Sequence, residues 1–186
     1  MGCKHLTLIN DDYRNHLSLV KKEQKSLVIY DPPYDKWEEV VRVDCKTQIA
    51  FTSPQNRHAT ERVLGKPRNE LVWVFKDGRW VSNNLPRITH NYIYVYGDTD
   101  DCAVGETQEI KTLKKGMSSI GKDNLGDRIY TTKANKHLNS VLEYSRNMRS
   151  GSWTKPIGLI QNLIEWIKPE IVFDFFMGSG TVGKVC

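Results

Sequence analysis

One stretch near the amino end constrains the fold of this chain more than any other: the apolar run Ser26–Tyr30, which leads directly into Asp31-Pro32-Pro33-Tyr34. A short β-branched run that stops at Asp-Pro-Pro predicts a buried strand followed by a stiff turn. Because proline fixes φ and has no N–H, such a turn cannot engage all of its carbonyls in helix or sheet hydrogen bonds. It therefore presents a carboxylate, carbonyl acceptors and an aromatic ring at a strand's carboxyl end, where open α/β sheets bind ligands. These groups suit a planar amino-heterocycle; the alternative is an ordinary proline-rich turn.

The size and composition of the chain indicate a water-soluble protein with one domain and an inserted subdomain at most, since it has 186 residues of which 39% are hydrophobic. No apolar run reaches the ~18 residues of a membrane span, and the first residues do not resemble a signal peptide. We therefore expect a cytoplasmic protein without a membrane partner. The net charge of +5 favours a polyanionic partner. The four cysteines are far apart, so they predict neither a zinc site nor a disulfide framework.

Hydrophobic periodicity predicts strands that alternate with helices over the first hundred residues, which is typical of a parallel βαβ sheet. A short strand is expected at 5–10, followed by a helix that Asp12 caps and that ends at Lys21-Lys22. Asp11 closes that strand, and it either caps the helix as well or points into the cleft beside Asp31. Further elements are predicted at 37–43 (helix), 47–52 (strand), 54–64 (helix), 70–75 (strand) and 91–96 (strand).

Two details of these strands lead to further predictions. Lys76-Asp77-Gly78 is a strong turn signal at the end of the 70–75 strand. Tyr92, Tyr94 and Tyr96 alternate along the 91–96 strand, and this spacing favours a half-buried face of the sheet over a platform for stacking bases.

The pattern changes between residues 98 and 152, where apolar residues are sparse. From Lys111 to Ser150 there are nine basic and three acidic residues. Two interpretations remain open: a solvated, partly disordered segment, or a surface that contacts a phosphate backbone. On the second interpretation the candidate nucleic-acid-binding residues are Lys111, Lys114, Lys115, Lys122, Lys133, Lys136, Arg146 and Arg149.

Regular structure is predicted again from Lys155-Pro156, which precedes an amphipathic helix that ends at Lys168-Pro169. A buried strand at 171–175 follows, and it leads into the glycine loop 178–184. This loop fits G-x-G-x-x-G, in which glycines let the backbone approach a ligand at a helix N-terminus. It also fits most of a P-loop, but Val185 stands where that motif needs Ser or Thr for Mg²⁺. The first template is therefore favoured.

Asp31-Pro32-Pro33-Tyr34 and Asp174-Phe-Phe-Met-Gly178-Ser-Gly180-Thr181 together resemble the two motifs of the DNA amino-methyltransferases, with Phe175 in place of the usual proline. The order of catalytic motif, basic region and cofactor loop resembles the circularly permuted beta class, and the resemblance covers nearly the whole chain. It implies an α/β fold with a Rossmann-like methyltransferase sheet, circularly permuted, with an inserted basic region. The implied parts are a catalytic part at 1–97, a target-recognition region at 98–152 and a cofactor-binding part at 153–186.

The resemblance also implies the activity and the site. The enzyme would methylate adenine N6 of a base flipped out of double-stranded DNA, with S-adenosylmethionine as the cofactor and without a metal. Asp31 and the carbonyl of Pro32 would accept hydrogen bonds from the exocyclic amine, Pro33 belongs to the same motif, and Tyr34 would stack on the base. The implied cofactor-binding residues are Asp11, Lys155, Pro156, Asp174, Phe175, Phe176, Gly178, Ser179, Gly180 and Thr181.

The sequence departs from the family at its end, because Cys186 comes six residues after Gly180. Members of the family continue with a helix and a strand whose acidic residue binds the ribose of the cofactor. We therefore expect a sheet that is truncated at the carboxyl end and has an unpaired edge. Three outcomes compete: weakened cofactor binding, completion of the fold by a second chain or an identical protomer, and a methyltransferase-like protein that binds DNA or a partner without catalysis.

Other substrates are alternatives to adenine. These are cytosine N4, RNA and the glutamine of a protein, because similar turns serve amine and amide nitrogens generally. A bacterial or phage enzyme of restriction-modification, working in the cytoplasm of the bacterial cell or host, would fit the resemblance.

Overall fold

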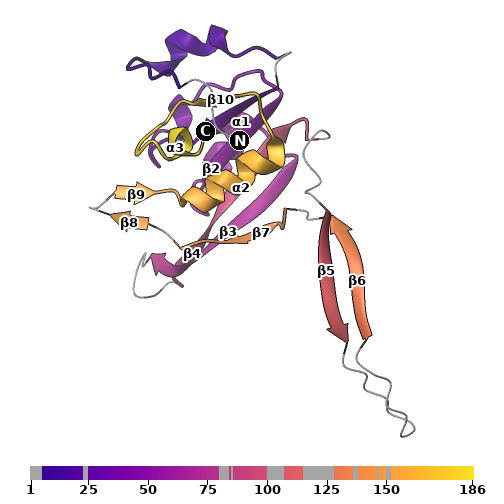
Figure 1. Ribbon diagram of the computed structural model, residues 1–186. Coiled ribbons are helices and arrows are strands. Elements are labelled where there is room, and N and C mark those ends of the chain that lie inside the picture. Colours follow the sequence, from indigo (N-terminus) through magenta and orange to yellow (C-terminus); the bar gives the residue numbers. More distant parts are fainter. Residues whose placement is uncertain are drawn as a thin grey trace, which may run out of the picture. The chain divides into compact units, whose positions relative to one another are not determined.

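The structure is a computed structural model that describes residues 6–22, 25–79, 84, 86–99, 107–114, 128–135, 138–145, 147–149 and 152–186. The chain divides into two compact units, Met1–Cys102 with Asn139–Cys186, and Ala103–Leu138. In chain order the elements, with η for a 3-10 helix, are η1 Tyr13–Leu19, β1 Ser26–Tyr30, η2 Trp37–Glu39, β2 Thr47–Thr52, α1 Arg57–Leu64, β3 Asn69–Arg79, β4 Ile88–Gly97, β5 Thr107–Lys114, β6 Arg128–Asn135, β7 Val141–Glu143, β8 Asn147–Arg149, β9 Ser152–Thr154, α2 Ile157–Ile167, β10 Ile171–Asp174 and α3 Thr181–Val185 (Figure 1).

The larger unit contains a six-stranded sheet with the strand order β10-β1-β2-β4-β3-β7. β1 is parallel to β10 and β2, and β3 is parallel to β7, whereas β4 is antiparallel to both of its neighbours. The α/β class is confirmed, but the prediction of a parallel βαβ sheet is wrong for β4. β4 comes directly after β3 in the order of elements, and strands joined without a crossover helix pair antiparallel.

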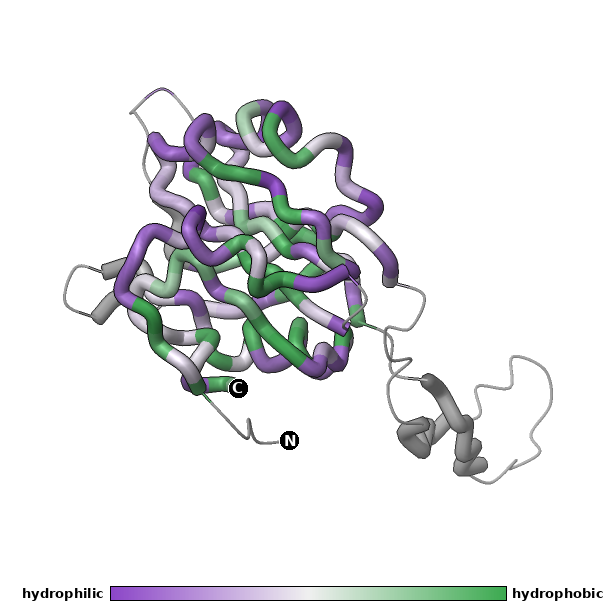
Figure 2. Tube along the Cα trace, turned by 90° about the horizontal axis from the view of Figure 1, so that it is seen from above, coloured by the Kyte–Doolittle hydropathy of each residue, from purple (hydrophilic) through white to green (hydrophobic). Residues whose placement is uncertain are grey.

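The two faces of the sheet are covered by different helices. Successive residues of a strand point to opposite faces. On one face Tyr30 and Tyr94 belong to a buried cluster that includes Leu64 of α1. On the other face Ile29 lines a pocket together with Ile160 of α2, and Figure 1 shows α2 lying across the sheet. Hydrophobic segments run through the middle of this unit and hydrophilic ones lie around them (Figure 2).

β1 and β2 have the bounds that the sequence predicts, and every residue of both strands is buried. This follows from their place in the sheet, since each has a paired strand on both sides. The three tyrosines of β4 form a row in which neighbouring ring centroids are 6.0 and 6.4 Å apart. Tyr94 and Tyr96 are buried, so the prediction of a sheet face is confirmed.

The predicted strand at 5–10 is wrong for its described part, because residues 6–10 belong to no strand. Leu6, Leu8 and Ile9 are exposed. The spacing of Leu6 and Leu8 suits a strand, but residues 6–10 pair with none of the strands of the sheet. The following helix is the 3-10 helix η1, and the predicted cap is confirmed, since Asp12 accepts a hydrogen bond of 3.0 Å from the backbone N–H of Arg14.

The predicted helix at 37–43 is a single 3-10 turn, η2. Two backbone N–H groups beyond this turn donate to tyrosine hydroxyls instead of to a helix: Val41 to Tyr13 at 2.9 Å and Val43 to Tyr30 at 3.0 Å. β-branched residues also lose rotamer freedom in a helix. Tertiary hydrogen bonds therefore replace the helix that the periodicity predicts.

Two strands differ from their predicted form. β3 continues through the predicted turn at 76–78, because its pairing with β4 shifts register between Val74 and Arg79 and this irregularity accommodates the extra residues. β10 is predicted to be buried, but its residues are half-buried or exposed. It is the outer strand of the sheet, so only one of its edges is paired.

The smaller unit is described by its two strands, β5 and β6, which pair antiparallel from Thr107 opposite Asn135 to Lys114 opposite Arg128. Across these ranges the basic region forms a pair of strands, and the choice between a solvated, partly disordered segment and a DNA-contacting surface stays open. Four candidate basic residues lie on strands (Lys111, Lys114, Lys133 and Arg149), and four lie outside the described residues (Lys115, Lys122, Lys136 and Arg146). Within the described ranges, no helix is long and apolar enough to cross a membrane.

Candidate functional site

The backbone carbonyls of the turn after β1 differ in their hydrogen bonding. The carbonyl of Pro33 accepts the backbone N–H of Lys36 at 2.9 Å. The carbonyl of Tyr34 accepts the side-chain amide of Asn56 at 2.8 Å. Among the described residues, the carbonyl of Pro32 has no hydrogen-bond donor. Two of these three carbonyls therefore hold the turn in place, and the carbonyl next to Asp31 keeps its capacity to accept.

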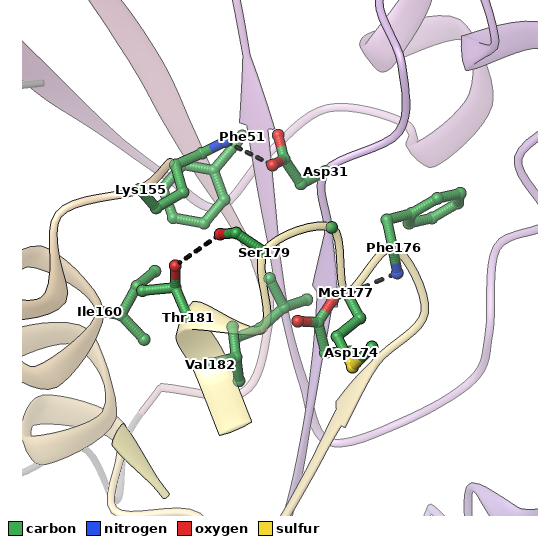
Figure 3. Close-up of a pocket in the computed structure, with 12 residues that line it drawn as sticks. Asp31, Phe51, Lys155, Ile160, Asp174, Phe176, Met177, Ser179, Thr181 and Val182 are labelled. Carbon is green, nitrogen blue, oxygen red and sulfur yellow. Dashed lines mark hydrogen bonds and ion pairs between the residues drawn. The ribbon is translucent and has the colours of Figure 1, made fainter. Parts of the chain in front are cut away.

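The carboxylate of Asp31 is paired with a residue from the far end of the chain. Its Oδ2 accepts a hydrogen bond from Nζ of Lys155, which lies directly before the helix α2. The same Nζ lies 4.9 Å from the centroid of the Phe51 ring on β2, within the range of a cation–π contact. The ammonium group thus lies between a carboxylate and an aromatic ring (Figure 3).

The glycine loop follows β10, the strand beside β1. The register places Ile29 of β1 opposite Asp174 of β10, so Asp31 and Asp174 lie at the same end of two neighbouring parallel strands. The loop then turns through two glycines with left-handed backbone, Gly178 at φ +49° and Gly180 at φ +70°. Residues with a side chain rarely adopt this conformation. A Cβ on Gly180 would meet no heavy atom within 4 Å, so this backbone is open to a ligand.

Asp174 is the most perturbed carboxyl group of the site. Burial raises its pKa from 3.8 to about 6, and the nearby charge of Asp31 acts in the same direction. The hydrogen bond from the Phe176 backbone N–H to Oδ1, of 3.2 Å, and the charge of Lys155 oppose this rise. A half-buried carboxyl group with a raised pKa beside a second carboxylate and an ammonium is typical of a functional site.

These groups surround one pocket with a cavity of about 50 Å³ (Figure 3). Two of the residues that line it, Ser179 and Thr181, have hydroxyls 3.1 Å apart. Seven residues singled out from the sequence line it: Asp31, Lys155, Asp174, Phe176, Gly178, Ser179 and Thr181. The structure thereby brings together residues from both ends of the chain.

Other residues singled out from the sequence do not line this pocket: Asp11, Pro32, Pro33, Tyr34, Pro156, Phe175 and Gly180. Asp11 is exposed and pairs with Nε2 of His16 at 2.9 Å. Phe175 stacks on Tyr13, with ring centroids 4.9 Å apart. Pro156 caps α2, and Tyr34 is 55% exposed at the surface.

Sequence reasoning missed five pocket residues: Ile29, Phe51, Ile160, Met177 and Val182. Ile29 could have been found, because it lies two residues before Asp31 in an extended segment and therefore shares its side of the chain. The contribution of Phe51 depends on Lys155 lying against it, and no local pattern indicates this contact.

The arrangement of charges suggests what the pocket can bind. It contains two carboxylates, Asp31 and Asp174, and one ammonium, Lys155. This balance suits a ligand that carries a positive charge. The loop from Gly178 to Thr181 adds two hydroxyls and a glycine backbone that a ligand can approach closely.

Comparison with known families gives one match, to the model described as DNA methylase, which represents N6 and N4 methyltransferases. It spans residues 56–186. The match therefore includes the glycine loop, whereas the Asp31-Pro32-Pro33-Tyr34 turn precedes it. No curated protein sequence matches the chain.

Solved structures are similar in fold. TTHA0409, a proposed DNA modification methylase from Thermus thermophilus, is 14% identical with a TM-score of 0.52, over 92% of this chain and 79% of that one. The same protein complexed with S-adenosyl-L-methionine is 13% identical with a TM-score of 0.50, over 92% and 80%. M1.HpyAVI is 13% identical with a TM-score of 0.50, over 94% and 78%. The predicted Rossmann-like methyltransferase fold is confirmed.

Proposed function

The chain belongs to the DNA methylase family of N6 and N4 methyltransferases, and on this basis we propose that it transfers a methyl group from S-adenosylmethionine to adenine N6 in double-stranded DNA. The observation that carries the proposal is the turn after β1. There the carboxylate of Asp31 lines the pocket together with the glycine loop, and the carbonyl of the next residue, Pro32, has no donor among the described residues.

These two oxygens suit an exocyclic amine, which has two N–H groups to donate. When both N–H groups are held, the nitrogen lone pair is drawn out of conjugation with the ring and can attack a methyl group. The protein contributes orientation and fixed electrostatics, which can lower a barrier by several kcal/mol. Asn56 and Lys36 bond the carbonyls of Tyr34 and Pro33 and so hold the backbone of the turn in place.

Tyr34 is the proposed stacking surface for the base. The residue is 55% exposed, and no aromatic contact of its ring is present among the described residues. A base in a duplex cannot reach a carboxylate at the end of a strand, so the enzyme must flip the base out of the helix. Tyr34 could then stack on the extruded base beside Asp31.

The residues of the pocket fit S-adenosylmethionine. Asp174 and the hydroxyls of Ser179 and Thr181 line the pocket and would hold it, together with the open backbone of Gly180 between them. When bound, the cofactor supplies a methyl group that its positively charged sulfur activates. Two carboxylates against one ammonium attract such a cation, and the small cavity around Lys155 must widen to admit it.

The choice of adenine, the permuted order and the DNA contacts rest on the sequence. The Asp-Pro-Pro-Tyr form of the motif favours adenine over cytosine. The pairing of β10 with β1 supports a circular permutation, since the catalytic turn comes first in the chain and the cofactor loop last. The basic residues between 98 and 152, which include Lys111, Lys114 and Lys133, are proposed to contact DNA phosphates.

The test is transfer of labelled methyl from S-adenosylmethionine to unmethylated DNA, followed by analysis of the nucleosides. We expect label in N6-methyladenine with the wild-type protein. Asp31→Ala should lower the rate at least about 100-fold, as loss of a single preorganised contact to the reacting group does. Thermal unfolding of both proteins serves as the control for folding.

Each other outcome changes the proposal. Label in N4-methylcytosine would keep the family and overturn the choice of adenine. DNA binding without any transfer would support a methyltransferase-like protein that binds without catalysis. Transfer by Asp31→Ala at the wild-type rate would contradict the role of the turn.

A further inference from the structure

Lys155 occupies the acceptor that the proposed reaction requires. Its ammonium group donates to Oδ2 of Asp31, the oxygen that faces the pocket beside the glycine loop (Figure 3). The Lys155 side chain is 18% exposed and the Asp31 side chain 36%. The carboxylate of Asp31 is therefore covered on the side of the cation and accessible on the other.

An ammonium group and an exocyclic amine compete for this oxygen, because both are N–H donors and a carboxylate oxygen accepts only in a few directions. The ammonium is the stronger donor, since its hydrogen bond to a carboxylate is charge-assisted. The ring of Phe51 holds it from behind, 4.9 Å from Nζ. A base amine that approaches Oδ2 from the pocket therefore has to compete with this ammonium.

We propose that Lys155 is a displaceable counter-ion of Asp31, a positioning residue whose ammonium occupies the place of the substrate amine until the base arrives. The proposal rests on the function assigned to Asp31 above. The resemblance of the chain to the family implies only that Lys155 binds the cofactor. Its role as a counter-ion of Asp31 is additional. Lys155 thereby disfavours the binding of an amine-bearing base by the protein without cofactor.

The structure also offers the displaced ammonium a second partner. Asp174 lines the same pocket, and the charge of Lys155 already influences the pKa of Asp174. The backbone of Lys155 is held by Pro156, which caps α2, whereas its four-carbon side chain is flexible. The ammonium can therefore move between the two carboxylates and stay in the pocket.

The experiment measures the binding of two nucleosides to the protein without cofactor. The first is 2′-deoxyadenosine, and the second is purine 2′-deoxyribonucleoside, which has the same ring and sugar but lacks the exocyclic amine. The variant is Lys155→Met, which removes the ammonium and keeps an unbranched stem against Phe51. Lys155→Arg, which keeps a cation at this position, is the matched control.

We expect Lys155→Met to bind 2′-deoxyadenosine about 5- to 10-fold more tightly than the wild type. The reason is that the nucleoside no longer has to break the charge-assisted hydrogen bond between Lys155 and Asp31. Binding of the purine nucleoside should not change, and Lys155→Arg should resemble the wild type. In the Asp31→Asn background, Lys155→Met should have no selective effect, because the negative charge that holds the ammonium is gone.

Equal changes for both nucleosides would overturn the proposal, since they would reflect packing of the side chain. Unchanged or weaker binding of 2′-deoxyadenosine, including no detectable binding to folded Lys155→Met, would also overturn it. The methyl-transfer assay keeps this result separate from the proposed function. If the wild-type protein methylates DNA but Lys155→Met shows no selectivity, the role of Lys155 is wrong and the proposed function stands. If Lys155→Met shows the selectivity but the wild-type protein does not methylate DNA, the proposed function is wrong and the competition at Asp31 stands.

Discussion

The two loops that form the site are built in opposite ways, although they follow neighbouring parallel strands. The turn after β1 contains two prolines and presents oxygen atoms, the carboxylate of Asp31 and the carbonyl of Pro32. The loop after β10 contains left-handed glycines and presents hydroxyls and exposed backbone, from Gly178 to Thr181. The first is stiff because proline fixes φ, and the second is shaped by positive φ values that glycine tolerates.

This difference separates two tasks. A turn that presents acceptors suits an amine donor, which must be held in one orientation. A glycine loop suits a larger ligand, because its backbone can lie against the ligand without a side chain between them. Lys155 links the two loops, since it pairs with Asp31 and influences the pKa of Asp174. Changes in one loop should therefore affect one ligand more than the other, and the following predictions test this.

The largest effect is expected from Asp174→Asn, measured as stability against pH. Burial raises the pKa of Asp174 to about 6 in the folded protein. Between about pH 4 and pH 6 this carboxyl group is therefore protonated in the folded protein and ionised in the unfolded chain. The free energy of unfolding should therefore fall as the pH rises from about 4 to about 6, by up to about 3 kcal/mol from this group. The asparagine variant keeps an acceptor for the Phe176 N–H and should lack this fall.

The measurement is chemical denaturation of both proteins at several pH values between about 4 and 7, the window that this shift defines. The difference in free energy of unfolding, variant minus wild type, should increase with pH over this window and level off above it. A difference that does not depend on pH would contradict the raised pKa.

A smaller effect is expected at the proline turn from Tyr34→Ala. Stacking of a base on an aromatic ring contributes about 2 kcal/mol, so KM for DNA should rise by roughly 30-fold. KM for the cofactor should not change, because Tyr34 does not line the pocket. Tyr34→Phe is the control that keeps the ring, and it should resemble the wild type in steady-state kinetics. Equal losses for the two variants would exclude stacking.

Gly180→Ala tests the glycine loop in the same way. A left-handed conformation costs a residue with a Cβ about 1 to 2 kcal/mol, and space is not the obstacle because a Cβ at this position has no neighbour within 4 Å. Cofactor binding measured by calorimetry should weaken about 5- to 30-fold. Gly183→Ala is the matched control, since Gly183 has no positive φ. Should both variants bind alike, backbone conformation is not what the loop requires.

The smallest effect is expected from Asn56→Asp, which removes the amide N–H that the Tyr34 carbonyl accepts at 2.8 Å. Loss of this hydrogen bond costs about 1 kcal/mol, and the looser turn should lower kcat by several-fold with KM for the cofactor unchanged. Asn56→Gln, which can still donate, should lose less. A change in KM for the cofactor instead of kcat would show that Asn56 acts on the other loop.

The sequence predicts the local parts of this protein well. The bounds of β1 and β2 and the helix α2 follow from hydrophobic runs and from Pro and Lys signals at their ends. The order of the two loops after their strands was also predictable, because Asp-Pro-Pro and closely spaced glycines interrupt regular structure wherever they occur. The sequence reasoning was weaker at 37–43, where hydroxyls of Tyr13 and Tyr30 bond the backbone N–H groups that a helix would use.

The sequence by itself thus determined which residues end the strands and what chemical groups they offer. Only the tertiary structure decided that β10 pairs with β1, which brings Asp174 beside Asp31, and that Lys155 extends to Asp31 across the ring of Phe51. The physical reason is the distance along the sequence over which each interaction acts. Proline and glycine act through the backbone of their own residue, whereas an ion pair between residues from opposite ends of the chain depends on which strands share hydrogen bonds.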